Sequence, residues 1–201
     1  MAHTLGTAPP TRRRRSDARR SIEAIVSAAR TVLGERPDAS MEDIAAAAGV
    51  TRQTVYAHFP SRDALMAAVV EAIRTEGLAA LDPAYLDTLS PADALAHLID
   101  IGWQMIRRYP PLLDPAVTRI PGPDGSDPHE PVAPHLERII RRGQGTGDFD
   151  RSLPTAWIAA AIFGLGHAAA EQMGAGLLDP GEARAVLLES VLRLCGASGA
   201  R

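Results

Sequence analysis

Apolar residues return at helical spacing along most of the chain. In the first predicted helix Ile22, Ile25 and Ala29 stand three or four positions apart, so they share one face. Residues that can cap a helix precede such segments, and Gly or Pro follows them. No segment shows the alternation of apolar and polar residues that is typical of a strand. The pattern predicts an all-α protein of about nine helices.

Start and stop signals set the expected boundaries of these helices. Ser16 or Asp17 can cap the first helix, which Gly34 and Pro37 would end. Residues 121–131 hold four prolines and two glycines and are expected to form a loop. The other expected helices cover residues 41–48, 52–58, 62–77, 91–109, 112–120, 132–142, 154–173 and 180–194, with a glycine-rich break at 143–147.

Residues 40–59 read as two short helices joined by a tight turn. Ser40 can cap the first of them, and Asp43 follows at the spacing of a capping box. Gly49 is expected to end that helix because glycine adopts positive φ without strain. Thr51 can cap the second helix. Two short helices with Gly at the bend are typical of a helix-turn-helix.

A helix-turn-helix places the start of its second helix in the major groove of DNA. Here Gln53 has the chemistry to pair with an adenine edge, and Arg52 with guanine or phosphate. The candidate DNA-binding residues are Ser40, Thr51, Arg52, Gln53, Thr54, Tyr56, His58 and Arg62. The same pattern fits an αα-hairpin in an ordinary helical bundle, and local chemistry alone leaves both interpretations open.

Charge is unevenly distributed between the two ends of the chain. All 21 basic residues are arginine, and 24 acidic residues bring the net charge to −3, which at first argues against a nucleic-acid binder. Residues 1–62 hold ten arginines and six acids, whereas the remainder holds eleven and eighteen. The basic end therefore contains the helix-turn-helix. Residues 1–15, with an arginine run, are expected to be a disordered basic arm.

The segment from Met41 to Leu65 resembles the DNA-binding region of the TetR/AcrR-type transcriptional regulators. The matching positions are Ile44-Ala45, Ala48-Gly49-Val50-Thr51, Thr54-Val55-Tyr56, His58-Phe59 and Ser61-Arg62. Gln53 stands where the family often has a small residue, and Arg62 replaces its usual lysine. The resemblance implies a DNA-binding domain over residues 16–77, with the helix-turn-helix at 40–59, and a ligand-binding and dimerisation domain over residues 78–201.

In proteins of this kind the C-terminal helices form a ligand pocket and a dimer interface. The segment 154–173 is apolar on most sides and should be buried, either within one subunit or, together with the last helix, against a second copy. The candidate pocket residues are Trp103, Ile106, Tyr109, Phe163 and His167, with His97 and Gln104 as further hydrogen-bonding groups.

The resemblance therefore implies a ligand-responsive repressor. It would bind a palindromic double-stranded DNA operator as a homodimer and be released by a small apolar or amphipathic effector. Two-fold symmetry suits this task, because two recognition helices must reach half-sites that lie about 34 Å apart on DNA.

Other function classes find little support in the sequence. Nucleophile elbows, phosphate-binding loops and metal-ligand spacings are missing, so we expect no enzyme, no cofactor and no metal site. The single cysteine, Cys195, fits a cytoplasmic protein, and the apolar run 157–170 is too short to cross a membrane. His129 and His135 are expected in solvent. Two alternatives stay open: a helix-turn-helix that binds a protein partner, and a small helical enzyme.

Overall fold

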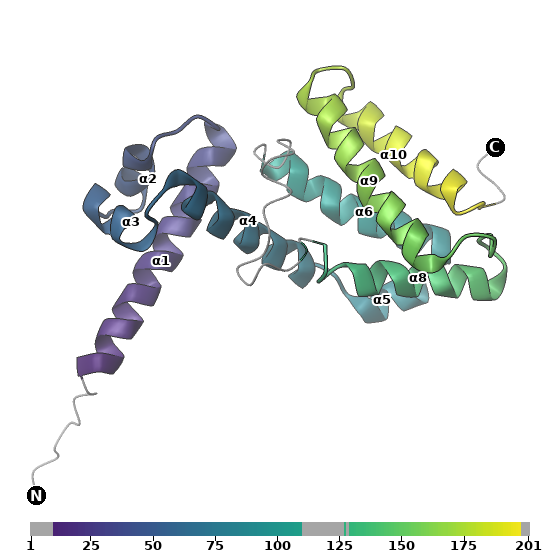
Figure 1. The fold of residues 1–201 in the computed structure, drawn as a ribbon, viewed down its shortest axis with the longest axis horizontal. Coiled ribbons are helices and arrows are strands. Elements are labelled where there is room, and N and C mark those ends of the chain that lie inside the picture. Colours follow the sequence, from purple (N-terminus) through teal and green to yellow (C-terminus); the bar gives the residue numbers. More distant parts are fainter. Residues whose placement is uncertain (1–9, 110–126, 128, 198–201) are drawn as a thin grey trace, which may run out of the picture. The chain divides into compact units, whose positions relative to one another are not determined.

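The computed structural model describes residues 10–109, 127 and 129–197, and this part of the chain contains nine helices and no strand (Figure 1). The all-α prediction is therefore confirmed. The helices are α1 (Pro10–Glu35), α2 (Met41–Ala47), α3 (Arg52–His58), α4 (Arg62–Ala79), α5 (Pro83–Thr88), α6 (Pro91–Arg108), α8 (Ala133–Thr146), α9 (Thr155–Gly174) and α10 (Pro180–Leu194). The helix expected at 112–120 lies outside the described residues.

The chain divides into two compact units, Met1–Val69 and Val70–Arg201. The division falls inside α4, earlier than the boundary after residue 77 that the sequence suggested. Among the described helices, none combines the length and the apolarity needed to cross a membrane.

The first unit is built on a small apolar core. Ile25 and Leu33 of α1 are fully or almost fully buried, as are Ile44 of α2 and Val55 of α3. Leu65, in the first turn of α4, is also buried. Each of these residues lies on the face that the helical spacing predicted, so the packing of this unit follows directly from the sequence pattern.

The start of the first helix was predicted wrongly. Helix α1 begins at Pro10, so residues 10–15 are helical rather than part of a disordered arm, and neither Ser16 nor Asp17 is its cap. Proline is favoured in the first turn of a helix because it has no amide N–H to satisfy there. Arginine is also a good helix former. Intrinsic propensity therefore outweighs the repulsion expected within the arginine run.

The second unit has a core formed by α6, α8, α9 and α10. Leu95, Leu136, Ile158 and Val191 contribute one side chain from each of these helices, and all four are fully buried. Helices α9 and α10 run side by side, as Figure 1 shows in green and yellow. This arrangement gives the unit a helical bundle around one continuous apolar core.

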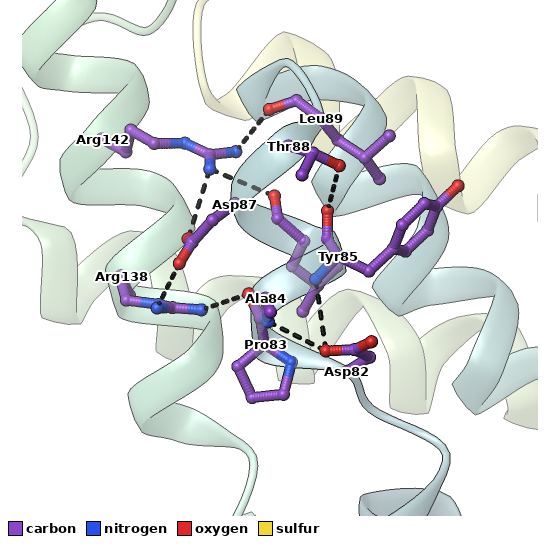
Figure 2. A network of polar contacts seen from close by, with 10 residues as sticks. Asp82, Pro83, Ala84, Tyr85, Asp87, Thr88, Leu89, Arg138 and Arg142 are labelled. Atoms are coloured by element: carbon purple, nitrogen blue, oxygen red, sulfur yellow. Dashed lines mark hydrogen bonds and ion pairs between the residues drawn. The ribbon is translucent and has the colours of Figure 1, made fainter.

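The short helix α5 was not predicted, because six residues are too few to show a helical period. Its polar ends are stabilised by other groups. Asp82 accepts hydrogen bonds from the amides of Ala84 and Tyr85 at its start, and two arginines of α8 bind groups along the helix and just after it (Figure 2). Carbonyl groups at a helix end lack partners within the helix, so long-range donors can stabilise it.

The two arginines that bind α5 are Arg138 and Arg142. Arg138 donates to the Asp87 carboxylate at 2.8 Å and to the carbonyl of Pro83 at 3.0 Å. Arg142 donates to the carbonyls of Leu86, at 3.1 Å, and Leu89, at 2.8 Å. Figure 2 shows both guanidinium groups reaching from α8 to the same short helix. The α5 segment is thus fixed to α8 by contacts between residues far apart in the sequence.

The glycine-rich break after residue 142 was placed too early. Helix α8 continues through Gly143 and Gly145 and ends only at Gly147, whose φ is 86°. Gly143 is buried, and a Cβ at its position would lie 2.2 Å from a ring carbon of Phe149. Its lack of a side chain therefore allows the Phe149 ring to pack on the helix, and it does not interrupt the helix.

Candidate DNA-reading surface and ligand cavity

The bend between α2 and α3 has the backbone geometry of a tight turn. Gly49 has a φ of 67°, and the amide of Val50 donates to the carbonyl of Ala45 at 3.0 Å. Only glycine reaches such a φ without steric cost. The turn therefore fixes the direction in which α3 leaves α2.

Ser40 and Asp43 form the capping box that the sequence predicted at the start of α2. The Ser40 hydroxyl accepts from the Asp43 amide at 3.1 Å, while the Ser40 amide donates to the Asp43 carboxylate at 2.8 Å. The hydroxyl also donates to that carboxylate at 2.6 Å. These bonds, led by the one from the Ser40 side chain, hold the pKa of the Asp43 carboxyl below its usual value.

The start of α3 is held by two threonines. The Thr51 hydroxyl accepts from the Thr54 amide at 3.1 Å, and the two hydroxyl oxygens lie 2.8 Å apart. Thr51 is therefore the cap that the sequence predicted. Both hydroxyls already have partners in this structure, so the pair primarily fixes the first turn of the helix.

The remaining side chains of the expected reading surface point outward from α3. Arg52 and Gln53 are exposed, and Tyr56 keeps 39% of its surface exposed. The Arg52 guanidinium lies 5.4 Å from the centre of the Tyr56 ring and 3.7 Å from the carboxylate of Glu42. The guanidinium next to Gln53 in the sequence is thus oriented by the Tyr56 ring and the Glu42 carboxylate.

His58 and Arg62 lie at the far end of α3 and at the start of α4. His58 is half-buried in the last turn of α3. The Arg62 guanidinium donates to the carbonyl of Pro37 at 3.0 Å and also to the carbonyl of Ala39. Arg62 therefore ties the loop before α2 to α4, a role that the sequence did not predict.

The second unit contains a cavity of about 320 Å³. The described part of its wall is formed by α4, α6, α8, α9, α10 and residues that follow α4 or precede α8, and it is mostly apolar. Four of the five predicted pocket residues line it: Trp103, Ile106, Phe163 and His167. Its size lies at the lower end of the range of about 300–1,000 Å³ that is usual for small-molecule sites.

Tyr109 was predicted in this wall, but it does not line the cavity. It follows the last residue of α6, is buried, and donates its hydroxyl to the carboxylate of Glu76 at 3.1 Å. The chain leaves the helix at Tyr109, so the ring turns toward α4. Gln104 and His97 are also absent from the wall; Gln104 is exposed, and His97 packs edge-on against Tyr85.

His129 lines the cavity, although the sequence suggested that it would lie in solvent. Its ring stacks on Phe163 with centres 4.2 Å apart, and its Nε2 lies 3.2 Å from Nε2 of His167. Burial, followed by the proximity of His167, lowers the pKa of His129. No sequence signal could have paired two histidines 38 positions apart. The described residues hold no cluster of three side chains suited to a metal ion.

The comparison with known families concerns the first unit of the chain. Residues 25–69 match the bacterial regulatory proteins of the tetR family. Over these residues the chain is similar to that family. The match includes α2, the turn, α3 and the first part of α4. TetR-family proteins are regulators, in agreement with the expectation that the chain is not an enzyme.

A curated relative is similar to part of the chain. The HTH-type transcriptional repressor LfrR of Mycolicibacterium smegmatis is 41% identical over 75 residues. That alignment covers 37% of this chain and 39% of LfrR, so the chain aligns with well under two thirds of the repressor's length.

Solved structures share the fold over nearly the whole chain. RolR in complex with resorcinol has a TM-score of 0.66 and 20% identity, and 92% of each chain is covered. LfrR from Mycobacterium smegmatis in complex with proflavine has a TM-score of 0.56 and 21% identity, with 92% of this chain and 99% of LfrR covered. At such low identity these structures establish the fold alone.

Proposed function

We propose that the protein is a transcriptional repressor that binds DNA through α3 and responds to a small molecule held in the cavity of its second unit. One observation carries this proposal: the first turn of α3 is capped by Thr51 and presents Arg52 and Gln53 to solvent, within the segment that matches the TetR family. A helix capped in this way can enter the major groove with its start leading.

The proposed DNA contacts divide into base-reading and phosphate-binding groups. Gln53 is exposed and has a donor and an acceptor suited to an adenine edge. Arg52 and Tyr56 lie together and suit phosphate or guanine contacts. His58 and the capping residues Ser40, Thr51 and Thr54 lie nearby in the sequence and complete the expected surface. Arg62 acts mainly by positioning, because its donors are directed at backbone carbonyls.

The protein acts, in this proposal, as a homodimer that pairs through α9 and α10. Among the described residues, helix α9 leaves one face exposed. On that face Trp157 keeps 62% of its surface exposed, and Ala160, Gly164 and Ala168 follow it at helical spacing. Val186 of α10 keeps 50% exposed. A second copy would cover these apolar residues, and the small ones would allow the helices to approach closely.

Ligand and DNA binding are coupled, in this proposal, through α4. Residues 62–69 of this helix belong to the first unit, while Val70, Arg74 and Leu78 line the cavity of the second. A ligand that favours one position of that wall changes the population of conformers that fit DNA. The operator is expected to be palindromic, with one half-site for each copy. We also expect the protein to work in the cytoplasm.

Fluorescence anisotropy with labelled DNA duplexes tests the proposal. Binding should weaken steeply as salt rises, because phosphate contacts release counterions. Gln53→Ala and Tyr56→Ala should each weaken binding to the preferred sequence by about 10-fold or more, equivalent to one lost polar contact. Tyr85→Ala, on α5 in the other unit, serves as the control and should bind as the wild type does. If neither α3 variant weakens binding, the proposed reading surface is wrong.

A further inference from the structure

The cavity wall has one polar feature that the proposed function does not explain. His129 and His167 bring their Nε2 atoms to 3.2 Å of each other in a wall whose described residues are mostly apolar, with Glu71, Arg74 and Thr75 as the other polar ones. One ring must donate an N–H and the other must accept it, so neither ring is required to be charged. A pair of this kind offers a donor and an acceptor at the same point of the cavity.

The neutral form of His129 is favoured by its surroundings. Four influences act on His129: burial and His167 disfavour its charged form, Asp127 favours it, and Arg74 disfavours it. The net effect lowers the pKa of His129, so the ring is neutral at and above neutral pH. The charges at the wall are balanced as well, because Arg74 lies 3.7 Å from the carboxylate of Glu71.

Charged ligands are poorly matched to such a site. A carboxylate has no N–H or O–H to donate and would need both histidines as donors, which requires a proton on a ring that burial keeps neutral. The cation of the wall, Arg74, already faces the carboxylate of Glu71. An ammonium group would lose its hydration in an apolar cavity, and the Glu71 carboxylate already faces Arg74. A hydroxyl group can accept a hydrogen bond from one histidine and donate a hydrogen bond to the other.

The shape of the wall beside the pair suits a flat molecule. His129 stacks on Phe163 with an angle of 13° between the rings, which makes a planar aromatic surface next to the two Nε2 atoms. Flat rings pack on such surfaces with favourable offset stacking. The cavity volume of about 320 Å³ limits the ligand to a small ring system.

We propose that the effector is an uncharged aromatic molecule of one or two rings that carries a hydroxyl group, with the hydroxyl bound by His129 and His167 and the ring beside Phe163. This inference rests on the proposed ligand-binding role of the second unit and specifies its chemistry. The hydroxyl enters between the two nitrogens, so one N–H···N bond is replaced by an N–H···O bond and an O–H···N bond. His129 lies outside any helix, in the turn before α8.

Isothermal titration calorimetry with four naphthalene probes tests this proposal on the full chain. The probes are 2-naphthol, 2-methoxynaphthalene, 2-naphthoate and 2-naphthylmethylammonium, which share a ring system and differ in charge and hydrogen-bonding groups. At pH 7.5 the naphthol should bind at least about 10-fold more tightly than each of the other three, the factor expected for one well-placed hydrogen bond.

Variants of the two histidines identify the group responsible. His129→Phe keeps a planar ring for the stack on Phe163 but removes both nitrogens, and His167→Phe removes the other partner. Each should reduce the preference for naphthol over methoxynaphthalene to within about 3-fold, because the donor–acceptor pair is lost. His135→Phe, on α8 but outside the cavity wall, is the control and should keep the full preference. Far-UV circular dichroism confirms that each variant is folded.

The outcomes separate this inference from the proposed function. Equal or tighter binding of a charged probe, absence of binding by all four probes, or an unchanged preference in both histidine variants would overturn the assigned ligand class. If naphthol binds with the expected preference yet leaves DNA affinity unchanged, the ligand class stands. The coupling between ligand and DNA then fails.

Discussion

The guanidinium of Arg62 donates to the carbonyl oxygen of Pro37 at 3.0 Å, across 25 positions of sequence. It also donates to the carbonyl of Ala39, so one side chain at the start of α4 holds the two ends of the loop that leads into α2. The family usually has a lysine at this position. An arginine can serve two carbonyls at once because its planar group carries several N–H donors.

Replacing Arg62 should loosen the first unit. Arg62→Ala removes two hydrogen bonds from a charged donor, and we expect the free energy of local opening around α2 and α3 to fall by about 1–3 kcal/mol. Arg62→Lys should have a smaller effect, since an ammonium group can retain one of the bonds. Native-state hydrogen exchange of the α2 and α3 amides measures this change, with the α9 amides as an internal reference.

Arg20→Ala provides the matched control for Arg62. Arg20 forms an exposed ion pair with Asp17 on the same helix, and such pairs contribute at most about 0.5 kcal/mol. In the Arg20→Ala variant the hydrogen-exchange rates of the α2 and α3 amides should equal those of the wild type. Wild-type rates in Arg62→Ala as well would mean that the two carbonyl contacts do not stabilise the loop.

Two glycines of α8 should respond in opposite directions to the same substitution. Gly143→Ala forces a Cβ against the ring of Phe149, and overpacking of this kind costs about 1–3 kcal/mol of unfolding free energy. Gly145→Ala meets no atom within 4 Å and should stabilise the helix by up to about 1 kcal/mol, because alanine has the higher helix propensity. Urea unfolding followed by tryptophan fluorescence reports both, and similar values for the two would contradict the assigned role of Gly143.

The capping box at Ser40 should give the first unit a stability that depends on pH. Since the pKa of Asp43 is lowered in the folded state, its contribution is present above the unfolded pKa and is lost as the pH falls through the folded value, below about 4. Ser40→Ala removes the largest cause of the shift, so the pKa of Asp43 should rise toward its ordinary value. A carboxyl carbon NMR titration measures it directly.

Asp43→Asn provides the test of that assignment. In this background the titrating group is gone, so adding Ser40→Ala should change the stability of the first unit equally at pH 3 and pH 6. If the effect of Ser40→Ala in the Asp43→Asn background still varies with pH, another carboxyl group is responsible for the pH dependence.

The exposed face of α9 predicts the assembly state. Trp157→Arg puts a charge where each copy would bury an aromatic ring. In a symmetric interface the substitution occurs on both copies, so the binding free energy is lost twice. The dimer dissociation constant should rise by at least about 100-fold, as expected for an interface centre. Sedimentation equilibrium measures this constant. Tyr85→Arg, at a side chain that is 47% exposed on α5, is the control and should leave the dimer intact.

Much of the fold could be predicted because the periodicity and the caps of a helix depend on residues that are close together in the sequence. Ser40 and Thr51 each cap a helix as expected, and Gly49 adopts positive φ as its place required. The errors have tertiary causes. Helix α5 depends on Arg138 and Arg142 from α8, and α8 extends past Gly143 because Phe149 packs there; neither contact can be read from local sequence.

The candidate sites were predictable to different degrees. The side chains around Gln53 follow from one short motif, so position along the sequence was enough to group them. The cavity required distant elements to meet. His129 joins His167 and Phe163 only through the fold, whereas Tyr109 turns away to Glu76 because α6 has ended. The net charge of the chain at first argued against DNA binding, because it averages a basic end and an acidic remainder.

Selection of bound sequences from a pool of random DNA duplexes tests the central claim, sequence-specific binding through α3, most directly. The wild-type protein should enrich an inverted repeat whose half-sites lie about one helical turn apart, since each copy of a dimer presents one α3. The same selection with Gln53→Ala should lose preference at one base position of each half-site and keep the spacing. The account would be contradicted if the wild type enriched no sequence. It would also be contradicted if Gln53→Ala enriched the same sequence as the wild type.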